Sequence, residues 1–265
     1  MTNDLHKLVK ILRESNHIVF FGGAGVSTES GIPDFRSANG LWNEKLKMEL
    51  SPEQLVSHTY FEIFPKEFFD FYREKLVYPD AKPNGCHKSL AQLEEMGKLL
   101  AIVTQNIDGL HQAAGSKTVY ELHGSVLRNY CMDCHIFYNA DFIMHSAPEP
   151  PRCEACGGIV KPDVVLYEEP LDGSIMQKAA DAIAHADTLI IGGTSLVVYP
   201  AAGFIRYFNG KHLIVINKTE TRADRSAELV IRTPIGETME SAIAALSNNE
   251  FLNKAINPVS LSGQT

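Results

Sequence analysis

Four cysteines form the pattern in this sequence with the most specific chemistry. Cys131-x-x-Cys134 and Cys153-x-x-Cys156 are separated by eighteen residues, a spacing typical of zinc ribbons. Each pair places two thiolates on one tight turn, and four thiolates complete a tetrahedron with no open position for water. The sequence therefore predicts one structural zinc ion here, in preference to two redox-active pairs. The fifth cysteine, Cys86, is expected to be a buried packing residue.

A second group of residues is suited to a phosphate ligand. The apolar run at 17–21 leads into Gly22-Gly23-Ala24-Gly25, and the run at 188–193 leads into Thr194 and Ser195. Glycines at the end of a strand let a diphosphate approach the backbone. The first turn lacks the third glycine of the usual dinucleotide fingerprint, so by itself it could be a plain tight turn. With Asn217 after a third apolar run, the turns indicate nucleotide binding.

Hydrophobic periodicity predicts the elements that position these residues. Helices are expected at 4–15, 51–78, 86–96, 174–186, about 200–208 and about 237–247, and strands at 17–21, 99–104, 118–122, 164–167, 188–193 and 212–217, with a loop at 28–43. Continuous apolar strands that alternate with helices imply a parallel sheet covered on both faces. We therefore predict an α/β, doubly wound fold. The aromatic segment at 51–78 and the cysteine segment break the alternation and predict a smaller inserted domain.

Composition narrows the classes of function. The chain has 265 residues, 45% of them hydrophobic, and a formal net charge of −8. A negative balance argues against direct, non-specific binding of nucleic acid or of anionic membranes. The first residues lack the apolar core of a signal peptide, and the apolar runs are too short to span a bilayer. A soluble, cytoplasmic protein is expected.

Taken together, these segments resemble the sirtuin family of NAD-dependent protein deacylases, in its bacterial form. The matching motifs are GAGVSTESGIPDFR (23–36), TQNIDGLH (104–111), ELHG (121–124), the two cysteine pairs, KPDVVLYEE (161–169), GTSLVVYPAAG (193–203) and IN (216–217). The resemblance implies a protein-lysine deacetylase that uses NAD as co-substrate, transfers the acetyl group to ADP-ribose and releases nicotinamide. It also implies acetylated proteins or peptides as partners, and we expect a monomer.

The resemblance implies a Rossmann-like NAD-binding domain and a smaller domain with two modules. We expect the first at 1–36, 84–124 and 164–250. The helical module is expected at 43–83, the zinc-binding module at 125–163 and a C-terminal tail at 251–265.

The resemblance further implies the roles of individual residues. His123 is the expected general base, and an ordinary histidine pKa of about 6.5 suits that task at neutral pH; Asn106 is the second catalytic residue. The implied cofactor-binding residues are Ala24, Ser27, Thr28, Phe35, Arg36, Gln105, Asn106, Ile107, Asp108, His123, Gly193, Thr194, Ser195, Asn217 and Ile235. The peptide is expected to pair, as an added strand, with Val164, Val165, Leu166, Tyr167 and Glu168.

Two features of the sequence bear on substrate preference. Ser37 and Glu168 stand where the family commonly has glycine, and Glu168 is a candidate for attracting basic residues beside the target lysine. Family members that prefer acidic acyl groups carry Tyr-x-x-Arg in the helical module, where this chain is expected to have Phe69-x-x-Tyr72. A neutral aromatic pocket would favour acetyl or longer fatty acyl groups. His87 and His111 are expected to be structural.

Two other functions remain open on the same NAD site. One is mono-ADP-ribosyl transfer to protein, and the other is a non-catalytic sensor of NAD or ADP-ribose. The complete set Phe35, Asn106, Asp108 and His123 favours the deacetylase.

Overall fold

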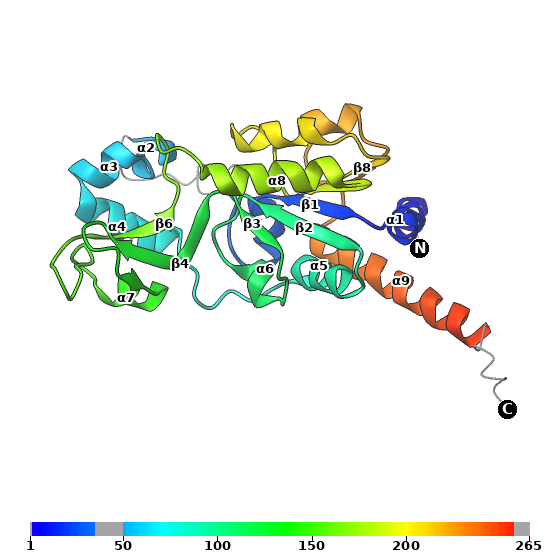
Figure 1. The fold of residues 1–265 in the computed structure, drawn as a ribbon, viewed down its shortest axis with the longest axis horizontal. Coiled ribbons are helices and arrows are strands. Elements are labelled where there is room, and N and C mark those ends of the chain that lie inside the picture. The colour runs from blue at the N-terminus through cyan, green and yellow to red at the C-terminus, as the bar shows by residue number, and fades with distance from the viewer. Residues whose placement is uncertain (1, 35–49, 257–265) are drawn as a thin grey trace.

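The computed structural model describes residues 2–34 and 50–256, and its centre is a six-stranded parallel sheet (Figure 1). Its strands are β1 (Ile18–Gly22), β2 (Leu99–Thr104), β3 (Val119–Glu121), β7 (Thr188–Gly192), β8 (His212–Ile216) and β9 (Leu229–Ile231), in the order β3-β2-β1-β7-β8-β9. The direction of strand succession reverses between β1 and β7, and ligands of such sheets bind outside the carboxyl ends at that point. The predicted doubly wound, Rossmann-like sheet is confirmed.

Helices cover both faces of this sheet because its strands alternate their side chains between two cores. Phe20 packs with Leu90 and Met239 in the core under α1 (Asn3–Glu14), α5 (Gly85–Glu95) and α9 (Ile235–Ile256). Phe21 packs with Ile183 and Phe204 in the core under α8 (Gly173–His185) and the 3-10 helix η4 (Ala201–Tyr207). Figure 1 shows the two helical layers above and below the sheet. Short helices η1 (Ala24–Val26), η2 (Thr28–Ser30), α6 (Leu110–Ala113) and η5 (Arg222–Arg225) lie in the connections.

A smaller domain lies beside the carboxyl ends of β1 and β2 (Figure 1). Its antiparallel sheet has the order β5-β4-β6, from β4 (Gly124–Cys131), β5 (Phe137–Tyr138) and β6 (Val160–Val164). Its helices are α2 (Pro52–Leu55), α3 (His58–Ile63), α4 (Pro65–Lys75) and α7 (Ala140–His145). Phe61, Phe68 and Tyr72 share one apolar core with Cys131 and Val160. Helices and cysteine ribbon therefore pack as one body.

Several predicted elements need correction. The segment at 51–78 forms three helices, not one: Ser57 caps the start of α3 after α2 has ended, and Pro65, which has no N–H to continue α3, begins α4. The predicted helix at 200–208 is a 3-10 helix, and α9 continues past 247 to Ile256. Of the predicted strand at 164–167, only Val164 belongs to a strand.

Several elements escaped prediction, among them β4, β5, α6, α7 and β9. Most of the predicted loop at 28–43 lies outside the described residues. In the described part of the chain, no helix is both long and apolar enough to cross a bilayer.

Candidate active site

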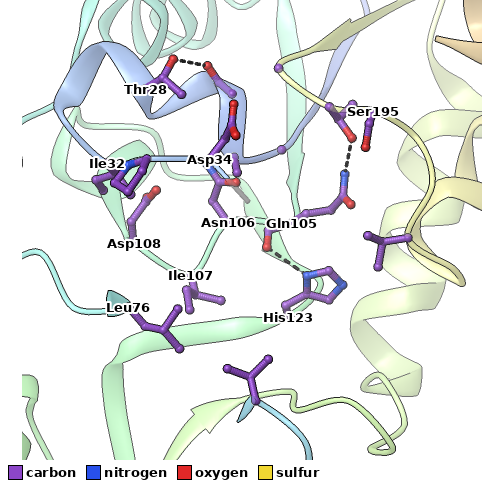
Figure 2. Close-up of a pocket in the computed structure, with 18 of the residues that line it drawn as sticks. Thr28, Ile32, Asp34, Leu76, Gln105, Asn106, Ile107, Asp108, His123 and Ser195 are labelled. Carbon is purple, nitrogen blue, oxygen red and sulfur yellow. Dashed lines mark hydrogen bonds between the residues drawn. The ribbon is translucent and has the colours of Figure 1, made fainter. Parts of the chain in front are cut away.

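One cavity of about 910 Å³ lies at the carboxyl edge of the large sheet, between it and the smaller domain. It collects polar side chains from separate strand ends, including Gln105 after β2, Thr194 after β7 and Asn217 after β8. Figure 2 shows Asn106 and Ile107, from the connection after β2, and His123, after β3, around this space, with Thr28, Ile32 and Asp34 from the loop after β1. The volume suits a dinucleotide-sized ligand.

The two glycine-rich turns pack backbone against backbone at one end of the cavity. Gly23 N–H donates to Gly192 O at 3.2 Å, and Gly25 N–H donates to Gly193 O at 2.8 Å. A Cβ on Gly25 would lie 2.8 Å from the Gly193 Cα, which is too close for a side chain. Gly193 itself has φ of 57°, where glycine is favoured. The glycines are therefore required by contact between the turns as well as by any ligand.

A hydrogen-bonded chain joins three of the predicted residues. Ser27 Oγ donates to Asp108 Oδ2 at 2.6 Å and accepts from Asn106 Nδ2 at 3.0 Å. Asp108 Oδ1 also accepts the Leu110 N–H at 2.9 Å. Ser27 is buried and stands behind the cavity wall. Its hydroxyl holds Asn106 and Asp108 in place, and its expected contact with a diphosphate stays a prediction.

His123 follows β3 and has one tautomer defined by its surroundings. Its Nδ1 lies 3.0 Å from Gln105 O; because a carbonyl only accepts, Nδ1 must carry the proton and Nε2 is left to accept one. Burial lowers the pKa of His123, against the opposing effect of this hydrogen bond. The imidazole is therefore neutral at neutral pH, as a general base must be.

The segment after β6 forms another wall of the cavity. Val165 N–H donates to His123 O at 3.0 Å, which ties the segment to the histidine. On its other side Tyr167 N–H donates to Val56 O, and His58 N–H donates to Tyr167 O, both at 3.0 Å. This parallel bridge joins Tyr167 to Ser57. The segment thus links His123 to the start of α3.

The predicted aromatic acyl pocket is wrong. Phe69 and Tyr72 are fully buried in the core of the smaller domain and are not part of the cavity wall, because α4 turns both rings inward against Phe61 and Phe68. The end of this helical segment reaches the cavity through Leu76 instead (Figure 2). The contacts that the described residues of this module make with the cavity are therefore aliphatic, from Leu76 and Val56.

The two remaining histidines of interest are buried beneath the site. His87 lies in the first turn of α5 and accepts the Asn84 N–H at 3.2 Å. Its ring centroid is 4.7 Å from that of His111. Burial lowers the pKa of His87 to about 4 and lowers that of His111 as well. Cys86 is also fully buried, as predicted.

The four paired cysteines converge on one point of the ribbon. All four Sγ atoms lie within 4.8 Å of one another, and Cys131–Cys156 and Cys134–Cys153 are 3.4 and 3.5 Å apart. A Zn–S bond of about 2.3 Å requires tetrahedral edges of about 3.8 Å. The turns that hold the two cysteine pairs have the same hydrogen bond. In each, the N–H four residues after the first cysteine donates to that cysteine's carbonyl: His135 N–H to Cys131 O, and Gly157 N–H to Cys153 O. The set fits one zinc ion.

The cavity gathers most of the residues that sequence reasoning selected. Its wall includes Ala24, Thr28, Gln105, Asn106, Ile107, Asp108, His123, Val164, Val165, Leu166, Tyr167, Glu168, Gly193, Thr194, Ser195, Asn217 and Ile235. Ser27 lies behind this wall, and Phe35 and Arg36 lie outside the described residues. Wall residues that were not selected include Glu29, Ile32, Val56, Glu169 and Thr233; Glu169 was readable, since it adjoins Glu168 in the same motif.

These features define a nucleotide-binding α/β protein with a metal-braced second domain. A model of the Sir2 family matches residues 23–200. An NAD-dependent protein deacetylase of Clostridium perfringens is 66% identical over 244 residues, which cover 92% of this chain and 100% of that relative. The chain belongs to the Sir2 family.

Solved structures agree with this assignment. One from work on the mechanism and regulation of Sir2 enzymes has a TM-score of 0.83 and 39% identity, and the match covers 94% of this chain and 100% of that chain. A Sir2–p53 peptide–NAD⁺ complex has a TM-score of 0.79 and 35% identity, and covers 95% of this chain and 100% of the other.

Proposed function

We propose that this protein is an NAD-dependent protein-lysine deacetylase. Its relatives are named for that activity, and a related structure holds peptide and NAD⁺ together. The observation that carries the proposal is the tautomer of His123, whose Nε2 accepts a proton inside a cavity of dinucleotide size. The products are the free lysine side chain, nicotinamide and O-acetyl-ADP-ribose.

In this proposal the glycine turns receive the NAD diphosphate beside Ala24 and Thr28. Asn106, Ile107 and Asp108 surround the nicotinamide, with Gln105 at the adjoining ribose. Gly193, Thr194, Ser195, Asn217 and Ile235 hold the adenosine end, and Phe35 and Arg36 complete the ribose and phosphate contacts. Support comes from the strand ends at which these residues stand, because open α/β sheets bind ligands there.

The acetyl-lysine carbonyl oxygen attacks the ribose C1′ as nicotinamide leaves. His123 Nε2 then takes the proton from a ribose hydroxyl as that oxygen attacks the carbon of the resulting imidate, and water completes the release of the lysine. The lowered pKa keeps Nε2 unprotonated before the step. The peptide backbone pairs with 164–168, so the acetyl-lysine enters beside His123 and Leu76. The zinc ion braces the ribbon and takes no part in the chemistry, since four thiolates leave no coordination position for substrate.

The test is incubation of an acetyl-lysine peptide with and without NAD, followed by mass spectrometry of peptide and nucleotide. We expect one nicotinamide and one O-acetyl-ADP-ribose for each lysine released, and no deacetylation without NAD. Deacetylation that ignores NAD would contradict the proposal. Transfer of ADP-ribose to protein without an acyl substrate would instead favour the transferase.

The domain boundaries, the cytoplasmic location, the monomeric state and the absence of direct nucleic-acid and membrane binding stay predictions from the sequence. Size-exclusion chromatography with light scattering tests the monomeric state directly.

A further inference from the structure

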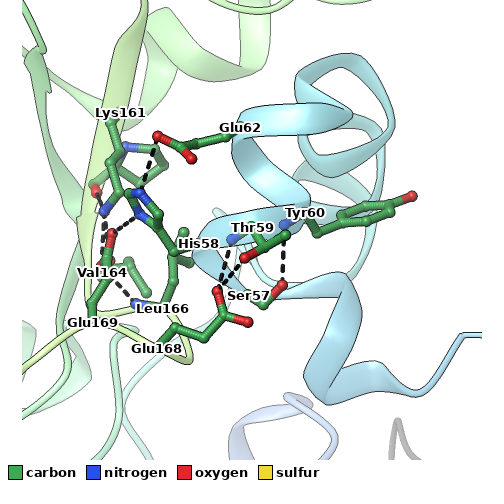
Figure 3. Close-up of polar contacts among 11 residues, drawn as sticks. Ser57, His58, Thr59, Tyr60, Glu62, Lys161, Val164, Leu166, Glu168 and Glu169 are labelled. Carbon is green, nitrogen blue, oxygen red and sulfur yellow. Dashed lines mark hydrogen bonds and ion pairs between the residues drawn. The ribbon is translucent and has the colours of Figure 1, made fainter.

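A cluster of charged side chains lies on the outer side of the segment at 165–168. His58, at the start of α3, places Nδ1 2.8 Å from Glu169 Oε1 and Nε2 3.2 Å from Glu62 Oε1. Lys161 of β6 places Nζ 3.2 Å from Glu169 Oε2. Figure 3 shows His58 between the two carboxylates, with Lys161 beyond Glu169. The cluster therefore spans α3, β6 and the segment between β6 and α8.

Glu169 is the centre of this cluster and also reaches the backbone of the segment. Its Oε2 accepts the Leu166 N–H at 2.9 Å, and its own N–H donates to Leu166 O at 3.1 Å. Lys161 Nζ donates to Val164 O at 3.1 Å. The carboxylate is only 19% exposed, which reduces competition from water. Its position thus determines where the backbone of the segment lies.

The cluster is one of several attachments that the segment makes. On the inner side Val165 N–H reaches His123 O, and on the outer side Tyr167 bridges to Ser57. His58 directly follows Ser57, and its side chain adds the contact with Glu169 on the same outer side. A change at His58 therefore acts on the outer attachment and leaves the contact with His123 and the glycine turns in place.

We propose that His58 is a positioning residue for the substrate peptide: its pair with Glu169 holds the segment at 165–168 in the place where the peptide backbone docks. The inference rests on the proposed function, because that function assigns the peptide to this segment. His58 touches neither the reacting atoms nor the nucleotide turns. Its effect is therefore expected in the affinity for peptide, with little change in kcat or in the affinity for NAD.

The charges around His58 determine how this contact depends on pH. The hydrogen bond to Glu169 is the main cause that raises the pKa of His58, with a smaller contribution from Glu62 and an opposing effect of burial. Burial would raise the pKa of Glu169, but the Leu166 N–H, His58 and Lys161 outweigh it, and the net pKa is lowered. Glu168 adds a further negative charge. The pair is thus charged below the pKa of His58 and loses its positive partner as pH rises through it.

The experiment measures peptide KM, NAD KM and kcat from about pH 6 to about pH 9, with an acetyl-lysine peptide that has no other titratable side chain. For the wild type we expect peptide KM to rise about two- to tenfold as His58 loses its proton. His58→Gln should show the higher KM at every pH. Glu169→Gln, which keeps an acceptor for Leu166, should do the same. His58→Lys, charged throughout, should retain the lower KM at high pH.

A matched control is the histidine–carboxylate pair at the opposite edge of the large sheet. His212 Nδ1 lies 2.6 Å from Glu228 Oε2 at the start of β8, away from the cavity. His212→Gln should leave the peptide KM and its pH dependence as in the wild type. A thermal unfolding midpoint for each variant separates positioning from loss of fold.

Three results would overturn the inference: a His58→Gln peptide KM equal to the wild-type value across the range, an equal rise of NAD KM, or no recovery in His58→Lys. Direct binding of a fluorescent acetyl-lysine peptide in the presence of ADP-ribose separates this from the proposed function. If the wild type binds peptide in a pH-dependent, His58-dependent way but releases no nicotinamide from NAD, the positioning role stands and the deacetylase proposal fails.

Discussion

The two halves of the cavity are held by different kinds of contact. The nucleotide half is made by backbone groups at strand ends, with Gly25 N–H on Gly193 O and Gln105 N–H on Gly22 O. The peptide half is held from outside by charged side chains, with His58, Glu169 and Lys161 in one cluster. Neutral backbone contacts that belong to a buried sheet do not titrate, whereas the charged cluster does. We therefore expect pH and metal to act on the peptide half first.

Removal of zinc should give the largest difference between the two halves, because it disrupts the peptide half and leaves the nucleotide half intact. The ribbon shares its core with α3 and α4, and β4 and β6 carry the segment that forms the peptide wall. Without metal, four adjoining thiols no longer hold the ribbon turns together. Deacetylation should fall below detection, while binding of ADP-ribose to the large domain, measured by calorimetry, persists. Cys131→Ser serves as the chelator-free control, and full activity after verified zinc removal would contradict the role.

His123→Ala should have the next largest effect, on chemistry alone. Loss of a general base lowers kcat by roughly 10²–10⁴, and both KM values should stay close to those of the wild type. Steady-state kinetics with saturating peptide and NAD measure the change. His185→Ala, on the exposed end of α8, is the histidine control. A kcat that falls less than tenfold would assign the proton transfer to another group.

The value of kcat should fall on the acid side of its pH profile. His123 must be neutral to act, and burial lowers its pKa; activity is therefore present above that pKa and lost as pH falls through it. We expect kcat to fall about tenfold per pH unit once the pH drops below the lowered pKa of His123, on the acid side of the ordinary histidine value of about 6.5. Peptide KM should instead change on the alkaline side of the pH profile, as His58 loses its proton. Coinciding limbs would show that one histidine governs both.

Gly25→Ala probes the nucleotide half directly. The added Cβ would meet the Gly193 Cα at 2.8 Å and the Gly193 O at 2.9 Å, and backbone atoms cannot turn aside. Separation of the two turns should raise NAD KM about tenfold and reduce the free energy of unfolding by about 1–3 kcal/mol. Gly173→Ala is the matched control, because nothing lies within 4 Å of its new Cβ. Unchanged NAD KM would show that the turns tolerate separation.

The same division explains what could be predicted from the sequence. The strand ends that form the nucleotide half follow from continuous apolar runs and glycine turns, and the cysteine spacing located the metal. The outer attachment could not be predicted, because His58 and Glu169 are 111 residues apart and no period relates them. The aromatic pocket failed for a similar reason, since the resemblance to the family's Tyr-x-x-Arg motif identified Phe69 and Tyr72 without showing which face of α4 turns inward.

Glu168→Gly should give the smallest effect, because two contributions oppose each other. Glu168 has φ of 77°, where glycine is less strained. Its carboxylate Oε2, however, accepts from Thr59 N at 2.9 Å and from Thr59 Oγ1 at 2.7 Å, at the start of α3 (Figure 3). Relief of strain and loss of these bonds should nearly cancel, leaving the midpoint of thermal unfolding within about 2 °C of the wild type.

The kinetic result for the same variant separates two roles of Glu168. Because one carboxylate oxygen already serves α3, attraction of basic residues in the peptide should be secondary to holding the segment. Peptide KM should therefore rise equally for a peptide with lysines beside the acetyl-lysine and for one with alanines there. A rise confined to the basic peptide would assign Glu168 to charge selection, and the holding of the segment would then be left to the other contacts, the His58–Glu169 pair among them.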